Sequence, residues 1–266
     1  MTAEDITESV SKLISPSIAD AIPKHWRLIP FIVADGLTQM AIDRYLFQQH
    51  AQGYSPPTLR FYGWAPIAIS LGYHQRTYPD HWRTSTWKGQ AIDLIPRPTG
   101  GRAVLHQGDL TYAVIASGFS GKRLESYQQI CEVLIQGWRS LGVELTYGQA
   151  GRGYIHNPNC FGTATGADLV LSDGSKLIGS AQARQGFTIL QHGSMRLQPD
   201  RTLFEQIFGT TDLSFPTLTP EQRDHQRIQT AIVNAAMSLW NIEFTIEPLS
   251  ESEWEQIRSD YSQAKS

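Results

Sequence analysis

The chain has 266 residues, of which 41% are hydrophobic and 18% charged, as in an ordinary soluble globular protein. Its net charge is −3 and no block of Lys or Arg stands out, which argues against a nucleic-acid-binding protein. The acidic N-terminus lacks the apolar core of a secretory signal, and no apolar run approaches the roughly 20 residues of a membrane span. We therefore expect a cytoplasmic protein, whose two cysteines can form at most one disulfide and stay reduced by default.

The hydrophobic pattern predicts strands and helices mixed without a strict β–α–β repeat. The expected fold class is therefore α/β of the α+β type, a mixed β-sheet with flanking helices. The sequence predicts a loosely attached helical segment over residues 1–25. The pattern then predicts helices over 35–52, 123–141, 220–240 and 252–262, and strands over 58–64, 67–73, 91–96, 103–104, 111–117, 167–171, 175–183, 187–197 and 243–247.

Residues 123–141 give the clearest amphipathic pattern. Tyr127, Leu134 and Trp138 recur at helical spacing, and Cys131 belongs to the same apolar stripe. A cysteine in that setting is typical of a hydrophobic core, so we expect Cys131 to be structural.

Thr99, Gly100 and Gly101 follow an apolar strand. Paired glycines permit positive φ and let a ligand lie against bare backbone, whose N–H groups can bind carbonyl, oxyanion or phosphate oxygens. The alternative is an ordinary tight turn, in which Gly-Gly is common. The segment matches neither a Walker loop nor the dinucleotide-binding fingerprint.

Cys160 lies in the polar loop Asn157-Pro158-Asn159-Cys160-Phe161-Gly162 rather than on an apolar face. That setting makes it a candidate nucleophile. A free thiol has a pKa of about 8.5, so only a few per cent is thiolate at neutral pH. A neighbouring cation would lower that pKa.

Lys176 is the candidate for this cation because it begins a strand directly after the Asp173-Gly174 turn. Strand alternation would place Lys176, Ile178 and Ser180 on one face, among small and polar groups typical of a site wall. The alternative is a solvated lysine, which is the commoner fate of a lysine beside a turn.

His106 and His192 could be general bases, donors in a site wall or structural histidines, and we favour a structural or pocket-lining role for both. No H-x-x-x-H or C-x-x-C spacing occurs, so a zinc site is not expected. Residues 151–153 read Gly-Arg-Gly, as in the adenylate loop of biotin ligases. Residues 99–103 fill that place better, so we interpret 151–153 as loop.

Four segments together resemble the lipoate–protein ligase A / octanoyltransferase family of the biotin–lipoate ligase superfamily. They cover most of residues 30–200 and are jointly specific. The segments are 35–36 with 40–43, 57–64 with 70–73, 97–106, and 176–182 with 191–194. The resemblance implies the biotin/lipoate protein ligase catalytic-domain fold. It also implies a single catalytic domain over 1–266, with a core of about 30–215 and a short C-terminal helical extension over 216–266.

Within this family, Cys160 indicates the branch. The chain is most similar to the cysteine-dependent octanoyl-carrier-protein:protein N-octanoyltransferases, whose cysteine also precedes the lysine hairpin. Pro96 departs from the family pattern, which usually has a second basic residue before Arg97. The tail after about residue 215 is too short to resemble a ligase accessory domain, which favours the transferase.

The resemblance implies an acyl transfer in two steps. Cys160 takes an octanoyl group from octanoyl acyl carrier protein as a thioester. A lysine of an apo lipoyl domain (glycine cleavage H protein or 2-oxoacid dehydrogenase E2) then takes the group as an amide. Lys176 lowers the pKa of Cys160 and helps to move the substrate proton. No metal or nucleotide cofactor is expected, and the protein is expected to be a monomer.

Backbone N–H groups of 100–103 or of 179–181 would stabilise the oxyanion, and Val104 and Ile178 would line the eight-carbon tail. The expected substrate-binding residues are Arg97, Thr99, Gly100, Gly101, Arg102, Ala103, Val104, His106, Ile178, Gly179, Ser180, Ala181, Gln182 and His192.

Three alternatives stay open. An ATP-dependent lipoate ligase would need ATP and Mg²⁺ and would tolerate loss of Cys160. An octanoyl amidotransferase would move the group between lipoyl domains and would ignore the carrier protein. A non-enzymatic binding module could also use the same fold.

Overall fold

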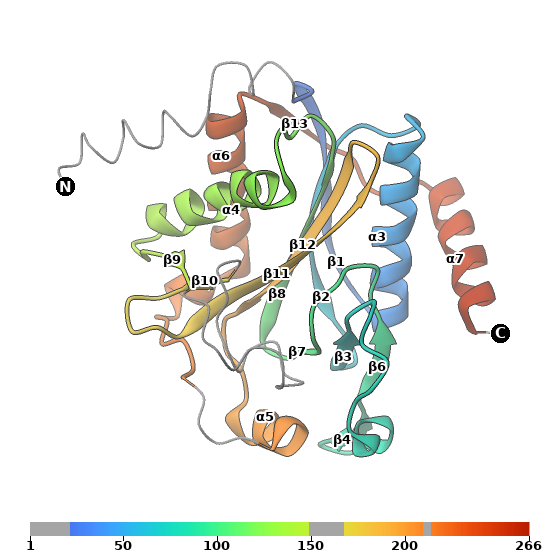
Figure 1. The fold of residues 1–266 in the computed structure, drawn as a ribbon, viewed down its shortest axis with the longest axis vertical. Coiled ribbons are helices and arrows are strands. Elements are labelled where there is room, and N and C mark those ends of the chain that lie inside the picture. Colours follow the sequence, from blue (N-terminus) through green and yellow to red (C-terminus); the bar gives the residue numbers. More distant parts are fainter. Residues whose placement is uncertain (1–21, 149–167, 210–213, 266) are drawn as a thin grey trace.

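The computed structural model describes residues 22–148, 168–209 and 214–265, the last six without side chains. Its main feature is an eight-stranded mixed β-sheet (Figure 1). The three strands at one edge are parallel and all other neighbours are antiparallel. The spatial order is β13 (Glu243–Ile246), β1 (His25–Ala34), β2 (Thr58–Trp64), β8 (Asp109–Ala116), β12 (Thr188–Arg196), β11 (Lys176–Gln185), β10 (Leu169–Val170) and β9 (Thr146–Tyr147). The predicted fold class is confirmed.

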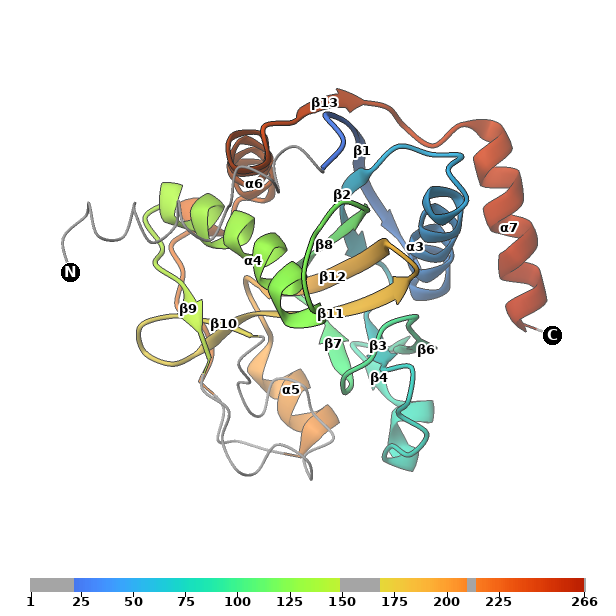
Figure 2. The same cartoon turned by 45° about the horizontal axis from the view of Figure 1, so that its top comes forward.

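Helices cover both faces of this sheet (Figures 1 and 2). One face packs on α4 (Arg123–Ser140) and α6 (His225–Trp240), and the other on α3 (Gly36–Ala51) and α7 (Glu251–Lys265). Strand alternation divides the core between them. In β8, Tyr112 and Val114 join the α4 and α6 cluster, whereas Ala113 and Ile115 join the α3 cluster.

The start of α3 is fixed by its first turn. The Asp35 carboxylate accepts hydrogen bonds from the Thr38 N–H at 2.9 Å and from the Thr38 hydroxyl at 2.7 Å. The predicted helix over 35–52 is therefore confirmed. α3 packs against both the sheet and α7. Its buried polar residues Gln39 and Asp43 face the sheet, where Gln39 donates to the Gly63 carbonyl at 2.8 Å and Asp43 accepts from Arg60 at 3.0 Å.

A second, three-stranded sheet stands beside the large one. It consists of β6 (Asp93–Pro96), β3 (Ala68–Leu71) and β7 (Val104–His106). Its own apolar cluster is closed by η1 (Asp80–Thr84), the hairpin β4 (Thr86–Trp87) and β5 (Gln90–Ala91), and α5 (Arg201–Phe208). The glycine pair follows β6 and precedes β7, so the small sheet positions this loop beside the large one.

Several elements differ from the predictions. The predicted helix over 220–240 divides into η3 (Glu221–Arg223) and α6, because the Asp224 carboxylate caps α6 by accepting the Arg227 N–H at 2.8 Å. β1 and α5 were not predicted. β1 contains Pro30 and shifts its register between Ile29 and Ile32, which disrupts the alternation that marks a strand.

The predicted helical segment over 1–25 lies almost wholly outside the described residues, and its last residue, His25, begins β1.

An ion pair joins the first strand to the last helix. Arg27 of β1 donates to both carboxylate oxygens of Glu253 on α7, at 2.7 and 2.8 Å. Burial alone would raise the pKa of Glu253, but the hydrogen bonds from Arg27 and the Ser250 N–H lower it. No helix in the described ranges is long and apolar enough to cross a bilayer.

Candidate active site

A cavity of about 490 Å³ lies where the glycine loop meets β8, β12, β11 and the first turn of α4. Its size is within the range of small-molecule sites. Most of the predicted substrate-binding residues line it. These are Arg97, Gly100, Gly101, Val104, His106, Gly179, Ser180, Ala181, Gln182 and His192.

Four predicted binding residues do not line this cavity. Ile178 is 1% exposed and belongs to the core cluster beneath α4, so the expectation that it contacts the acyl tail is corrected. Ala103 is buried in the cluster of the small sheet. Thr99 and Arg102 support the loop instead. The Thr99 hydroxyl bonds to His192, and the Arg102 carbonyl accepts a hydrogen bond from Arg97.

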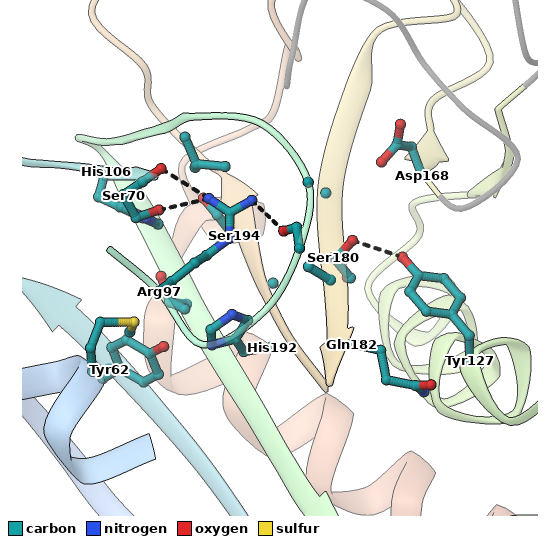
Figure 3. A pocket seen from close by; sticks show the side chains of 18 of the residues that line it. Tyr62, Ser70, Arg97, His106, Tyr127, Asp168, Ser180, Gln182, His192 and Ser194 are labelled. Atoms are coloured by element: carbon teal, nitrogen blue, oxygen red, sulfur yellow. Dashed lines mark hydrogen bonds between the residues drawn. The ribbon is translucent and has the colours of Figure 1, made fainter. Parts of the chain in front are cut away.

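Arg97 fixes the shape of the glycine loop (Figure 3). Its guanidinium donates to the carbonyls of Ser70, Gly100 and Arg102 at 2.9, 2.7 and 2.8 Å. Gly101 has φ +91°, which favours glycine. A Cβ on the neighbouring strand end, at Gly72, would lie 1.8 Å from the Gly101 carbonyl oxygen. The glycine loop is therefore a tight turn whose backbone also forms part of the cavity wall.

His192 connects this loop to α3. Its Nε2 lies 2.6 Å from the Thr99 hydroxyl and its Nδ1 lies 2.8 Å from Asp43. Asp43 is fully buried and also accepts from Arg60 at 3.0 Å and from the Tyr62 hydroxyl at 2.9 Å. A carboxylate with this many donors is stable in the core because each oxygen is satisfied.

His106 has a parallel arrangement in the same wall. Its Nε2 lies 2.8 Å from the Ser70 hydroxyl, its Nδ1 lies 2.9 Å from Asp109, and its ring stacks on Trp64 at 3.8 Å between centroids. Burial lowers the pKa of the His106 imidazole more than Asp109 raises it, so the ring is neutral near pH 7. Both histidines therefore have partners on both ring nitrogens, which fits the structural and wall roles expected for them.

Lys176 is buried rather than solvated, so the alternative of a solvated lysine is wrong. Its side chain is 3% exposed, and its Nζ lies 2.8 Å from the carboxylate of Asp168, which is 5% exposed and lines the cavity. Sequence reasoning missed Asp168. The pair forms only because the hairpin of β10 and β11 folds the two residues together, and no motif marks that contact in advance.

The wall formed by α4 and β11 is held by hydroxyl groups. The Tyr127 hydroxyl donates to the Ser180 carbonyl at 3.3 Å (Figure 3). The Tyr112 hydroxyl lies 2.8 Å from the Ser180 hydroxyl. Cys131 is fully buried behind this wall, and burial raises its pKa to about 12. The prediction that Cys131 is a core residue is confirmed, and its thiol is not activated.

Two candidate features lie outside the described residues. They are Cys160 and the Gly-Arg-Gly segment over 151–153. Among the side chains that the structure does describe, no group of three or more His, Cys, Asp or Glu is placed to hold a metal ion.

The site as described belongs to a defined class of enzyme folds. The glycine loop, the small residues of β11 and Asp168 line one cavity on a mixed sheet, and the buried Lys176 reaches it through its ion pair with Asp168. The family model for the lipoyl protein ligase A/B catalytic domain matches residues 35–233. The chain belongs to that family.

Sequence relatives share most of the chain. Octanoyltransferase LipM of Kyrpidia tusciae is 36% identical over 224 residues, which cover 80% of this chain and 78% of the relative. Octanoyltransferase LipM of Bacillus subtilis is 34% identical over 225 residues, with 80% and 77% covered.

Solved structures agree on the fold. Lipoate-protein ligase A bound with ATP has a TM-score of 0.69 at 19% identity, covering 90% of this chain and 95% of that one. A bipartite lipoate protein ligase of Thermoplasma acidophilum, described with its E2 lipoyl domain, has a TM-score of 0.68 at 19% identity, covering 91% and 93%.

Proposed function

We propose that this chain transfers an octanoyl group to a lysine of lipoyl domains through a Cys160 thioester. The broader activity is supported over most of the chain: it is an acyltransferase of protein lipoylation, similar to the octanoyltransferases above. The observation that carries the proposed chemistry is the buried Lys176, which forms an ion pair with Asp168 in the wall of a cavity large enough for an acyl chain.

In the first step, the Cys160 thiolate attacks the carbonyl carbon of octanoyl acyl carrier protein. The carrier's thiol leaves with a proton, and an octanoyl thioester forms on the enzyme. Lys176 favours the thiolate because a cation in a poorly solvated site stabilises a nearby anion strongly. Asp168 keeps this ammonium in place and offsets the free energy of burying it.

In the second step, the ε-amine of the lipoyl-domain lysine attacks the enzyme thioester. An amide forms and the Cys160 thiol is released, so the net reaction needs no metal and no nucleotide. Lys176 takes part in the proton transfer from the amine. Backbone N–H groups of residues 100–103 or of 179–181 stabilise the oxyanion, and both segments border the cavity.

We further propose lipoyl domains as acceptors, either glycine cleavage H protein or 2-oxoacid dehydrogenase E2. The support is the shared fold with the Thermoplasma acidophilum ligase, which is described with an E2 lipoyl domain. A cytoplasmic setting would keep Cys160 reduced for this chemistry.

Intact-protein mass after mixing with octanoyl acyl carrier protein, without ATP, tests the proposal. Wild type and Cys131→Ala should gain one octanoyl group that hydroxylamine removes, and Cys160→Ala should gain none. Apo lipoyl domain added afterwards should take the octanoyl group from the enzyme.

Other outcomes identify the alternatives. Modification of the lipoyl domain only with ATP and free octanoate would make the protein a ligase. Transfer from an octanoylated lipoyl domain but never from the carrier would make it an amidotransferase.

A further inference from the structure

The mouth of the cavity is basic on a chain whose net charge is −3. Lys122 and Arg123 are exposed where α4 begins, and Arg123 and Leu124 border the cavity itself. Arg184 of β11 is half-buried beside them, because its guanidinium donates to the hydroxyl of Ser126 on α4. We call Lys122, Arg123 and Arg184 the basic rim.

The charge of the basic rim is available to a partner. Glu125 lies on the same turn of α4, where its carboxylate accepts the backbone N–H of Lys122 at 3.0 Å and caps the helix, so one carboxylate stands against the three cations of the basic rim. In the part of the chain that the structure describes, no carboxylate forms an ion pair with any residue of the basic rim. Leu124, 55% exposed, adds an apolar contact in the middle of these charges.

We propose that the basic rim docks the acidic surface and the phosphodiester of the carrier that delivers the octanoyl thioester. The proposal rests on the proposed function, in which the donor is a protein. A carrier-borne acyl group enters the cavity at the end of a phosphopantetheine arm, so a phosphate anion and the carrier surface lie at the mouth. Cations there raise the rate of encounter with such a partner.

The same charges argue against the acceptor as the occupant of the basic rim. The acceptor enters with a lysine, whose ammonium is repelled by Lys122 and Arg123. The donor arm carries the opposite charge, because its phosphodiester is an anion. We therefore assign this side of the mouth to the donor.

The test compares a donor that has the carrier protein and its phosphodiester with one that has neither. Initial rates are measured with octanoyl acyl carrier protein and with octanoyl-pantetheine, which has neither protein nor phosphate, using one apo lipoyl domain as acceptor. For Lys122→Glu, we expect KM for the carrier donor to rise about tenfold with kcat unchanged, and no change with octanoyl-pantetheine. The matched control is Arg227→Glu, an exposed charge reversal on α6 that should change neither.

Salt gives a measurement on the unaltered protein. The wild-type KM for the carrier donor should rise about threefold between roughly 50 and 300 mM NaCl, and Lys122→Glu should flatten that dependence. The proposal is overturned if Lys122→Glu slows both donors equally, or if it raises KM for the lipoyl domain instead of the carrier. A wild type that never accepts octanoyl from the carrier would overturn the proposed function itself, whereas a salt-independent reaction with that donor would overturn only the docking surface.

Discussion

The cavity has two walls that are built on different principles. The wall formed by the glycine loop, β7, β8 and β12 is a dense polar network, in which His106 and His192 each have hydrogen-bonding partners on both ring nitrogens. The wall formed by β11 and α4 presents the small residues Gly179 and Ala181, with the Lys176–Asp168 pair at its edge. In Figure 3, Arg97 and His192 lie on the first side and Asp168 on the second.

The two walls therefore have different roles: the first sets the shape of the site and the second its reactivity. A network whose buried groups are mutually satisfied is rigid, and disturbing it is costly in stability. A small-residue wall leaves room for a ligand, and a buried charge at its edge can act on that ligand. Variants on the first wall should therefore change mainly stability and loop position, and variants at the edge of the second should change mainly the rate.

The largest expected effect is at Lys176. Lys176→Met removes the cation, so the rate of thioester formation should fall about a thousandfold. Lys176→Arg keeps the charge and should recover part of that rate. Intact-mass kinetics with octanoyl acyl carrier protein measure it, with Lys24→Met as an exposed control. A loss below tenfold in a folded Lys176→Met protein would remove Lys176 from the mechanism.

The next effect is at Asp43. Asp43→Asn leaves Arg60 buried without its carboxylate, which should lower the free energy of unfolding by about 3 kcal/mol and Tm by about 10 °C. Thermal and urea unfolding measure this, with Asp80→Asn as an exposed control. An unchanged Tm would show that the network around His192 contributes little to the fold.

Two glycines of the loop region give a matched pair. Gly72→Ala places a Cβ 1.8 Å from the Gly101 carbonyl oxygen, so it should cost about 2 kcal/mol and raise KM by displacing the loop. Gly100→Ala meets no atom within 4 Å and should leave unfolding unchanged. If both variants unfold at the wild-type temperature, the loop is not held as tightly as its contacts imply.

The smallest effect is a pH dependence from His106. Its folded pKa is lowered by burial, whereas the unfolded pKa is about 6.5. The unfolded state therefore binds more protons below pH 6.5, and stability falls as pH falls, by at most about 1.4 kcal/mol per pH unit. Unfolding of wild type and His106→Gln between pH 8 and 5 tests this. Equal pH slopes for the two proteins would contradict it.

Much of the fold could be predicted because the hydrophobic residues of its helices and strands recur at regular spacing. Residues 58–64 and 123–141 were expected as a strand and a helix, and they form β2 and α4 with nearly those bounds. β1 could not be predicted in this way, because Pro30 and the register shift interrupt its alternation. α5 is short and takes its place from contacts around Trp82, which is distant in sequence.

The candidate site also has a part that the sequence could predict and a part that it could not. The glycine loop and the 179–182 segment could be located from sequence, since small residues beside strands mark a backbone-lined cavity. The burial of Lys176 and the identity of its partner could not, because both depend on how β10 and β11 pair. Ile178 shows the limit of strand alternation, since both faces of β11 are covered at that position. The role of Cys160 stays a prediction.

The parallel pairing of β1 with β13 has a consequence for how the chain is made. β1 begins at His25, and its partner strand ends at Ile246. A chain emerging from the ribosome must therefore present the outer edge of β1, with unpaired N–H and C=O groups, until more than two hundred further residues have been synthesised. An open strand edge is a template for association with other chains. Protection of this edge until β13 is made, for example by a chaperone, would therefore raise the yield of folded protein.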